Sequence, residues 1–377
     1  MNKLPIINTL LALNRYNKGA VILLTVILLL IMMTLVTLYT GKIQSFEHQI
    51  MVNTQNQKWA QASAKYGLNQ GIAIINVNKA WSGLTVSGSL DDNSAFIISA
   101  ITEVLPGSRK LITIKANGKS ADDLAHASVA EQLLVYPILF NLPPAPLMVK
   151  HGFSHVGEFE VVPNPDGLSI STPLSLWSDA FITLTGSRHH SCILSEFNKD
   201  NCSTNTYSDH SIKQNDIADE SDSFPTDIFG YLFNIPATQW TQLQQQADFV
   251  LANCDTLDVD SYGVIWIVGD CNVSASRQIG SKSEPIILII FDGNVEFQED
   301  VVMHGLLFSF KPAASIKTLD INMQNNSAVF GVIISNYQLG TKMSLTRVVF
   351  QADVIKNLQA SKTLQRVARV PGSWHDF

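Results

Sequence analysis

An uninterrupted apolar run near the start of the chain is its strongest pattern. Residues 19–41 (GAVILLTVILLLIMMTLVTLYTG) form a run of 23 residues without a charged side chain. As a helix that rises about 1.5 Å per residue, the run spans about 34 Å, and the hydrocarbon core of a bilayer is about 30 Å thick. A backbone in hydrocarbon must satisfy its own hydrogen bonds. The pattern therefore predicts one membrane-spanning helix that carries a large body.

Charges on either side of this run predict its orientation. Lys3, Arg15 and Lys18 precede it without any acid, whereas Lys42 and Glu47 follow it. Positive charge favours the cytoplasmic side, so we expect the N-terminus in the cytoplasm and the body across the membrane. A cleaved signal peptide is the alternative. It is less favoured because the run is longer than a usual signal core and no small-x-small cleavage site follows it before Lys42.

The helical pattern continues over residues 43–78. No proline occurs between Pro5 and Pro106. Apolar and small side chains recur at spacings that fit one stripe of a helix, and they are Trp59, Ala60, Ala62, Ala64, Leu68, Ile72 and Ile75. Small residues alternate with larger ones in this stripe, which favours a helix pressed closely against a sheet. A generic amphipathic helix is the alternative.

Strand patterns replace helical ones in residues 79–145. The β-rich runs lie at 95–104, 111–116 and 129–136. Turn-forming residues around Gly107 and Gly118 separate them. A long helix followed by an antiparallel meander is an α+β plan. We therefore expect a helix over residues 20–78 and an antiparallel sheet over 79–145 that packs on it.

Residues 146–253 are expected to form a second, β-rich domain. It has strand patterns around the turn 163–167 (PNPDG), and then a polar stretch, 186–226, that is rich in Ser, Asn and Asp. We expect this stretch to be a long surface excursion clamped by a disulfide. Helical patterns return in 226–253.

Short apolar runs recur through residues 254–377, with glycine or aspartate between them. They lie at 264–268, 286–291, 301–303, 306–310, 328–335 and 348–354. No strict period emerges. The pattern fits stacked short strands with tight turns, so this C-terminal domain is predicted to be either a β-solenoid or a β-sandwich.

Charge and cysteine content narrow the possible functions. The formal net charge is −7, which argues against nucleic-acid binding because that requires a basic face. The cysteines fall in two close pairs, Cys192 with Cys202 and Cys254 with Cys271. In an exported body they predict disulfides, and local pairing is preferred among the three possible connectivities. Their spacing lacks the C-x-x-C pattern of zinc and redox sites.

Candidate catalytic or metal-binding side chains are few, and they are His151, His155, His189, His190, Asp216, Asp219, Glu220 and Asp222. Adjacent histidines on a strand point to opposite faces, and histidines four apart meet only on a helix. The acids could hold calcium, but they lack the spacing of an EF-hand, so a solvated loop is preferred. No phosphate-binding loop, G-x-S-x-G elbow or H-E-x-x-H motif is present. We expect no enzyme, no metal and no cofactor.

The string Lys18-Gly19-Ala20, followed at once by the apolar helix, resembles the processing site of type IV prepilins. In that family a prepilin peptidase cuts after the glycine. The helix stays, first as a membrane anchor and later as the packed core of a filament. The resemblance implies a leader of residues 1–19, a cut between Gly19 and Ala20, and other pilin-like subunits as partners of the helix.

The remaining helix, from Ala20 to Thr40, departs from that of major pilins. They carry a glutamate at the fifth mature position, whereas this chain has Leu24 followed by Thr25, and no acid occurs until Glu47. A charge in the membrane is costly and tends to be functional. Its absence suggests a subunit that does not pair with a neighbour's amino terminus. This gap is typical of PilX-type assembly proteins and of large minor pseudopilins.

Two further segments resemble PilX-type proteins. One is a strand ending in V-V-P-N-P followed by P-L-S-L-W-S, over residues 161–178, and the other lies at 59–70, where Lys65 and Tyr66 depart from that family's pattern. The resemblance implies a minor pilin-like subunit that takes part in assembly of a type IV pilus or pseudopilus, in a priming or tip complex. It would lie in the inner membrane with a periplasmic body, and later on the pilus or cell surface. The alternative is a surface adhesin at the pilus tip, and a third hypothesis is a periplasmic enzyme on a single anchor.

Overall fold

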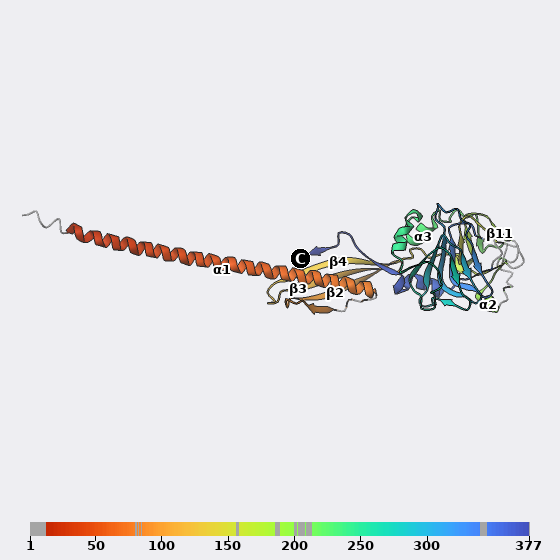
Figure 1. Ribbon diagram of the computed structural model, residues 1–377, viewed down its shortest axis with the longest axis horizontal. Helices are drawn as coiled ribbons and strands as arrows, with labels where there is room; N and C mark the ends of the chain where they lie inside the picture. The colour runs from red at the N-terminus through yellow and green to blue at the C-terminus, as the bar shows by residue number, and fades with distance from the viewer. Residues whose placement is uncertain are drawn as a thin grey trace, which may run out of the picture.

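The protein is elongated (Figure 1). The computed structural model describes residues 13–79, 81, 83, 85–155, 158–184, 189–199, 202, 208, 213–339 and 345–376. A long helix leads from the N-terminal end, a small sheet lies along its C-terminal part, and a β-rich domain forms the opposite end of the molecule. We call the small sheet and the helix segment packed on it the head, and the β-rich domain, residues 147–349, the solenoid.

The helix α1 (Leu13–Val77) is 65 residues long, which corresponds to about 98 Å at the usual helical rise. Every residue from 19 to 55 is exposed, and we call this part the rod. Its apolar side chains from Val21 to Tyr39 are 47% to 72% exposed. The helix is long and apolar enough to cross a membrane. The helix predicted from the apolar run is thus present, and it continues without a break into the head.

The C-terminal part of α1 packs against the head sheet with most of the predicted stripe, and the buried members are Ala60, Ala64, Leu68, Ile72 and Ile75. The prediction is wrong for Trp59 and Ala62, which are exposed. Ala62 lies about 200° around the helix from Ala60, since each residue turns about 100°. Ser63, Gly67 and Gly71 complete the buried face instead.

Glycines let α1 lie close to the sheet. A Cβ at Gly67 would lie 2.9 Å from the Phe96 ring, and a Cβ at Gly118 would lie 2.3 Å from the carbonyl oxygen of Ala60. No side chain fits at either distance. The small residues of the predicted stripe are therefore explained by close approach of helix and sheet.

The head sheet is antiparallel, in the order β1-β2-β3-β4-β24, and β25 also pairs with β4. Its strands are β1 (Val86–Ser89), β2 (Ala95–Leu105), β3 (Arg109–Lys119), β4 (His126–Pro137), β24 (Gln365–Arg369) and β25 (His375–Asp376). The predicted meander is confirmed as β2-β3-β4, and helix and meander together form the expected α+β plan. The sequence did not predict β24 and β25, by which the C-terminus returns to the head (Figure 1).

The solenoid is a stack of short, mostly parallel strands in three columns. The first column is, in order, β14 (Phe249–Leu251), β15 (Val264–Val268), β18 (Ile286–Phe291), the second part of β20 (Val302–Phe310), the second part of β22 (Ala328–Ser335), β5 (Leu147–Val149), β10 (Leu176–Ser178) and β13 (Ile217–Ala218). The second column is β17 (Gln278–Ile279), the first parts of β20 and β22, β23 (Leu345–Val349), β7 (Glu158–Val162) and β12 (His189–Ser191).

The third column contains β16 (Cys271–Val273), β19 (Val295–Phe297) and β21 (Ile321–Met323), and then the parallel pair β6 (Phe153–His155) and β11 (Ile182–Leu184). An antiparallel hairpin, β8 (Asn164–Ser169) with β9 (Thr172–Leu174), extends from the stack. Of the two architectures that the sequence left open for the C-terminal domain, the solenoid is the one formed.

The chain enters the stack in its middle. β5 lies between β22 and β10, and β7 lies between β23 and β12. Residues 147–218 build one end of the stack, and residues 249–349 build the rest. The strands of residues 147–218 and 249–349, which were expected to lie in separate domains, therefore share one sheet and one core. Residues 365–376, expected in the C-terminal domain, belong to the head sheet instead.

The inner strands of the first column, from β15 to β10, are mostly buried on both faces. Ile265, Leu288 and Leu307 point into the solenoid. The neighbouring side chains, such as Trp266, belong to a second core under α3 (Ile228–Phe233), α4 (Trp240–Gln245) and α5 (Ala352–Ala360). The short helices η1 (Ala237–Gln239) and η2 (Lys362–Leu364) adjoin them. Strands covered on both faces read as continuous apolar runs, which is why no alternation is visible in the sequence.

Candidate functional site

The predicted processing site lies at the N-terminal end of the rod. Gly19 and Ala20 are helical and exposed, while the side chain of Lys18 and leader residues 1–12 lie outside the described part of the chain. A Cβ built on Gly19 meets no atom within 4 Å. Packing within the described structure therefore does not require glycine here, so a requirement for it would come from a partner.

The threonines in the apolar part of the rod can enter an apolar environment with their hydroxyl groups paired. Thr25 Oγ1 donates to the carbonyl oxygen of Ile22, and Thr40 Oγ1 donates to that of Val36, each at 2.8 Å. Leu24, at the position of the pilin glutamate, is 63% exposed. A helix that is apolar on all sides is stable when it is surrounded by lipid or by other helices.

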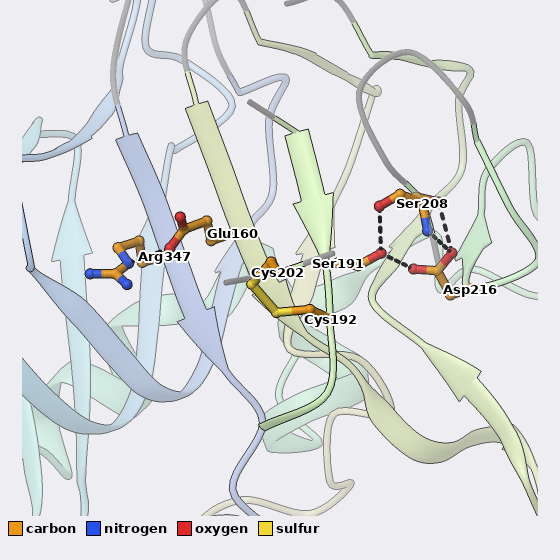
Figure 2. The surroundings of a disulfide bond; sticks show 7 residues. All are labelled: Glu160, Ser191, Cys192, Cys202, Ser208, Asp216 and Arg347. Atoms are coloured by element: carbon orange, nitrogen blue, oxygen red, sulfur yellow. Dashed lines mark hydrogen bonds and ion pairs between the residues drawn. A yellow bond between two sulfur atoms is a disulfide. The ribbon is translucent and has the colours of Figure 1, made fainter. Parts of the chain in front are cut away.

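The structure contains two local disulfides, Cys192–Cys202 and Cys254–Cys271. The first fastens α2 (Leu194–Phe197) to the second column, where Phe197 packs in a small cluster that includes both cysteines. The Arg347 guanidinium lies 4.7 Å from the centre of the Phe197 ring, and Arg347 Nε donates to Glu160 Oε2 at 2.6 Å (Figure 2). This cluster is a structural clasp at the end of the molecule farthest from the rod (Figure 1).

A buried carboxylate organises the chain beside this clasp. Asp216 is 1% exposed. It accepts hydrogen bonds from the hydroxyls of Ser191 and Ser208, at 2.6 and 2.7 Å, and from the Ser208 amide at 3.1 Å (Figure 2). The Ser175 hydroxyl also donates to it, at 2.6 Å. A buried charge with this many donors is stable. Asp216 therefore ties the β10, β12 and β13 region together.

The other acids and histidines singled out in the sequence do not converge. Asp219 Oδ2 accepts from the amide of Ile182 and from Lys213. The exposed His151 lies 3.7 Å from Asp179. The side chains of His155 and His189 lie outside the described part of the chain. Among the residues that the structure describes, no group of three or more His, Cys, Asp or Glu side chains could hold a metal ion.

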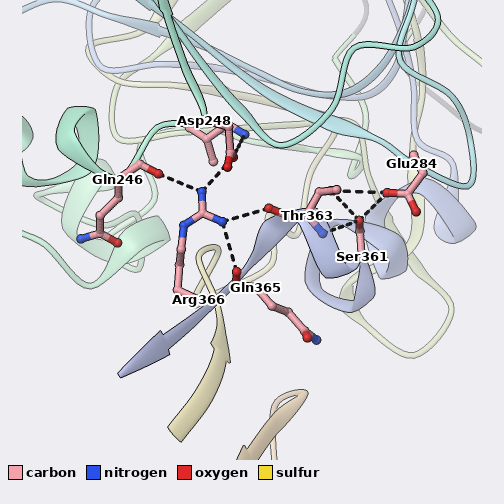
Figure 3. Close-up of polar contacts among 8 residues, drawn as sticks. Gln246, Asp248, Glu284, Ser361, Thr363, Gln365 and Arg366 are labelled. Atoms are coloured by element: carbon pink, nitrogen blue, oxygen red, sulfur yellow. Dashed lines mark hydrogen bonds and ion pairs between the residues drawn. The ribbon is translucent and has the colours of Figure 1, made fainter. Parts of the chain in front are cut away.

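Head and solenoid meet at a polar junction (Figure 3). Arg366 on β24 donates from Nη2 to the carbonyl oxygen of Gln246 at 2.8 Å and to Asp248 Oδ2 at 2.9 Å, and from Nη1 to two carbonyl oxygens of its own segment. Ser361 Oγ donates to Glu284 Oε2 at 2.6 Å. The sequence analysis missed Arg366, because no local pattern indicates that residues 365–369 return to β4.

A groove of about 580 Å³ lies at the same junction. It is lined by residues of both parts, among them Arg109, Tyr136, Phe140, Gln242 and Gln246. None of its described lining residues is Asp, Glu, His, Cys, Ser, Thr or Lys. Such a groove offers apolar and hydrogen-bonding contacts but no general base and no strong nucleophile, so its chemistry suits binding rather than catalysis.

The comparison with solved structures includes the crystal structure of the competence-associated pilin ComZ from Thermus thermophilus. The alignment has 10% sequence identity and a TM-score of 0.28, and covers 85% of this chain and 97% of that chain. A likeness at this TM-score does not establish a shared fold. No protein-family model matches the chain, and no curated protein matches it. Inferences about function therefore depend on the geometry described above.

Proposed function

We propose that this protein is a minor pilin-like subunit that takes part in assembly of a type IV pilus or a related pseudopilus. The observation that carries the proposal is α1, which is bare and apolar over residues 19–40 and packed against an antiparallel sheet over residues 60–75. One helix can thus span a membrane and later pack among similar helices. Its partners would be other pilin-like subunits, the inner membrane and a prepilin peptidase.

The position of the solenoid supports a place in a priming or tip complex. The solenoid extends beyond the head, at the end of the molecule opposite the rod (Figure 1). A subunit inside a filament shaft has neighbours along the filament axis on both sides, and this domain would fill the space of the next head. At the end of a filament the same space is open.

The proposal predicts a cut between Gly19 and Ala20, with the rod retained. Mass spectrometry of the protein purified from membranes should find Ala20 as the first residue. Gly19→Leu should block the cut. Gly41→Leu is the matched control, because a Cβ at either glycine meets no atom within 4 Å and both lie on the exposed rod. An intact leader in the wild type, or a cut beyond residue 41, would contradict the proposal.

A surface adhesin at the pilus tip is the second candidate. The clasp of Cys192–Cys202, Arg347 and Glu160 supports it, because it strengthens the part of the solenoid farthest from the membrane. Deletion of the gene separates the two roles. Loss of filaments supports the assembly role, whereas normal filaments with defective attachment support the adhesin.

A further inference from the structure

The end of the solenoid formed by residues 248–279 has an open sheet edge. β14 is the last strand of the first column, and on its other side no strand of the described chain pairs with it. Asp248 N donates to the carbonyl oxygen of Val264 at 2.9 Å. Gly263 and Gly269, at the two ends of β15, direct their peptide groups to β18. Because peptide groups alternate in direction along a strand, the Phe249–Ile265 register directs those of Phe249 and Leu251 to β15 and those of Val250 to the open edge.

The core at this end is closed by a short cap, but the edge is not. The cap is the segment 252–262, in which Cys254 and Leu257 are buried and the Cys254–Cys271 disulfide holds it to the last turn. Apolar side chains remain 38% to 51% exposed around the edge, and they are Phe249, Val250, Val259, Tyr262 and Val268. The rings of Phe249 and Tyr262 are in contact, with centroids 5.2 Å apart.

Acidic side chains surround these apolar residues. Residues 248–276 contain five aspartates and no lysine or arginine. Asp255, Asp258, Asp260 and Asp270 are exposed, whereas Asp248 is paired with Arg366. Arg277 reaches the cap, where its guanidinium donates to the carbonyl oxygens of Asp255 and Leu257. The rim therefore keeps more negative than positive charge.

We propose that β14 binds an extended, basic segment of a partner polypeptide as an added strand. The outward peptide groups of β14 would supply main-chain hydrogen bonds. Apolar side chains on one face of the segment would cover Phe249 and Tyr262, and its lysines or arginines would pair with the aspartates of the rim. A second copy of this chain is a poor occupant at the same edge, because its own acidic rim would be repelled. The inference does not depend on the pilus role.

The test uses the full chain in detergent micelles and a fluorescent peptide, Lys-Val-Lys-Val-Lys-Val. We expect it to bind, and to bind less tightly as salt is added. The acidic peptide Glu-Val-Glu-Val-Glu-Val and the interrupted peptide Lys-Val-Lys-Pro-Lys-Val should bind about ten-fold more weakly or worse, since proline cannot complete a strand ladder. Absence of binding by all three peptides would show that the aspartates only protect the edge, and would overturn the proposal.

Two variants locate the site. Val250→Pro removes the outward amide of β14 without removing an amide directed at β15, and should weaken binding of the basic peptide about ten-fold. Asp258→Asn with Asp260→Asn should weaken it and reduce its salt dependence. Asp91→Asn with Glu103→Gln, which removes two exposed charges from the head, is the matched control. Wild-type affinity in Val250→Pro or in the rim variant contradicts the proposal. If Val250→Pro does not fold, the rim variant alone decides the test.

Discussion

Head and solenoid are both β-structures, but they are built by opposite rules. In the head, β2, β3 and β4 are consecutive in the chain and pair antiparallel through short turns. In the solenoid, paired strands are parallel and come from separate turns of the stack, as when Ile265 pairs with Leu288 and Leu288 with Leu307. In the meander of the head each turn therefore leads directly to the paired strand, whereas in the solenoid the chain completes a turn of the stack before it pairs again.

The way in which the two parts are joined extends this comparison. Pro137 at the end of β4 pairs with Gln365 at the start of β24, and Ile138 N donates to the carbonyl oxygen of Leu364 at 2.9 Å. The chain leaves the head sheet at one strand and returns at its neighbour. The whole solenoid is thus inserted between two adjacent strands, and neither rod nor head needs it to complete a sheet.

Removal of the solenoid is the largest test of this comparison. Replacement of residues 139–363 by Asn-Gly would close β4 and β24 into a two-residue hairpin, for which this dipeptide is well suited. We expect rod and head to fold, because the head core formed by α1 and its sheet is retained. Hydrogen exchange measured by mass spectrometry should show residues 95–135 as protected as in the full chain.

The matched control removes the returning strands instead. A chain that ends at residue 360 keeps the solenoid strands but lacks β24 and β25, so β4 becomes an open edge. Its head should exchange faster than the head of the hairpin variant. If the hairpin variant lacks protection while the truncated chain keeps it, the insertion model fails.

The same contrast explains what the sequence could reveal. The turn at Gly107 and the β-rich runs were sufficient to predict the meander, because each strand pairs with its neighbour in the chain. The turn expected around Gly118 was misplaced, because Gly118 lies within β3 and the turn follows at residues 120–125. Runs such as 286–291 revealed a stack but neither its order nor its size, because entry at β5 places residue 147 beside residue 333. Arg366 and β24 were not predictable, since their partner lies at the other side of the insertion. The predicted processing site carries its signal locally, in residues 18–20.

Glycine substitutions should break each part separately. A Cβ at Gly331, which has φ 148°, would lie 1.9 Å from the carbonyl oxygen of Gly305 in the neighbouring strand, and a Cβ at Gly118 would lie 2.3 Å from that of Ala60. Gly331→Ala should destabilise the solenoid by about 4 kcal/mol and leave the head protected. Gly118→Ala should destabilise the head, because it separates α1 from the sheet, and should leave the solenoid protected.

Hydrogen exchange of residues 264–335 and 95–135 measures the two effects. Gly269→Ala is the control, because its φ is 104° but a Cβ there meets no atom within 4 Å. It should cost only the backbone strain, about 1 to 2 kcal/mol. If either substitution removed protection from both parts at once, head and solenoid would unfold as one unit, and the claim that they are separate folds would be wrong.

Alkaline pH should weaken the solenoid through Tyr337. Burial raises the pKa of this phenol from 10.0 to about 12. The unfolded chain therefore loses its phenolic proton first, so the contribution of Tyr337 is complete below pH 10 and is lost as the pH rises towards 12. At pH 11 the loss amounts to about 1.4 kcal/mol.

Tyr337→Phe removes the pH-dependent contribution of the phenol. It also leaves the Ser309 hydroxyl without its partner, the Tyr337 hydroxyl at 2.6 Å. Its free energy of unfolding should be about 1 kcal/mol lower than that of the wild type at pH 8. Urea unfolding of both proteins at pH 8 and pH 11 should show that the difference shrinks or reverses. A difference that does not change with pH would mean that the phenol is not protected by burial.

The last test concerns Arg366, the residue that couples head and solenoid. Its guanidinium is mostly buried and joins β24 to Gln246 and Asp248 at the end of the solenoid. Arg366→Ala should cost about 1 to 2 kcal/mol, because charge-assisted hydrogen bonds at a half-buried junction are stronger than surface ion pairs. Arg366→Lys keeps the charge but not the planar guanidinium group, so it should recover only part of the lost free energy of unfolding.

The decisive readout is cooperativity of unfolding rather than stability. If the junction couples two independent folds, calorimetry should resolve the head and solenoid transitions further apart in Arg366→Ala than in the wild type, whereas a uniform shift of both would mean that Arg366 stabilises a single folding unit.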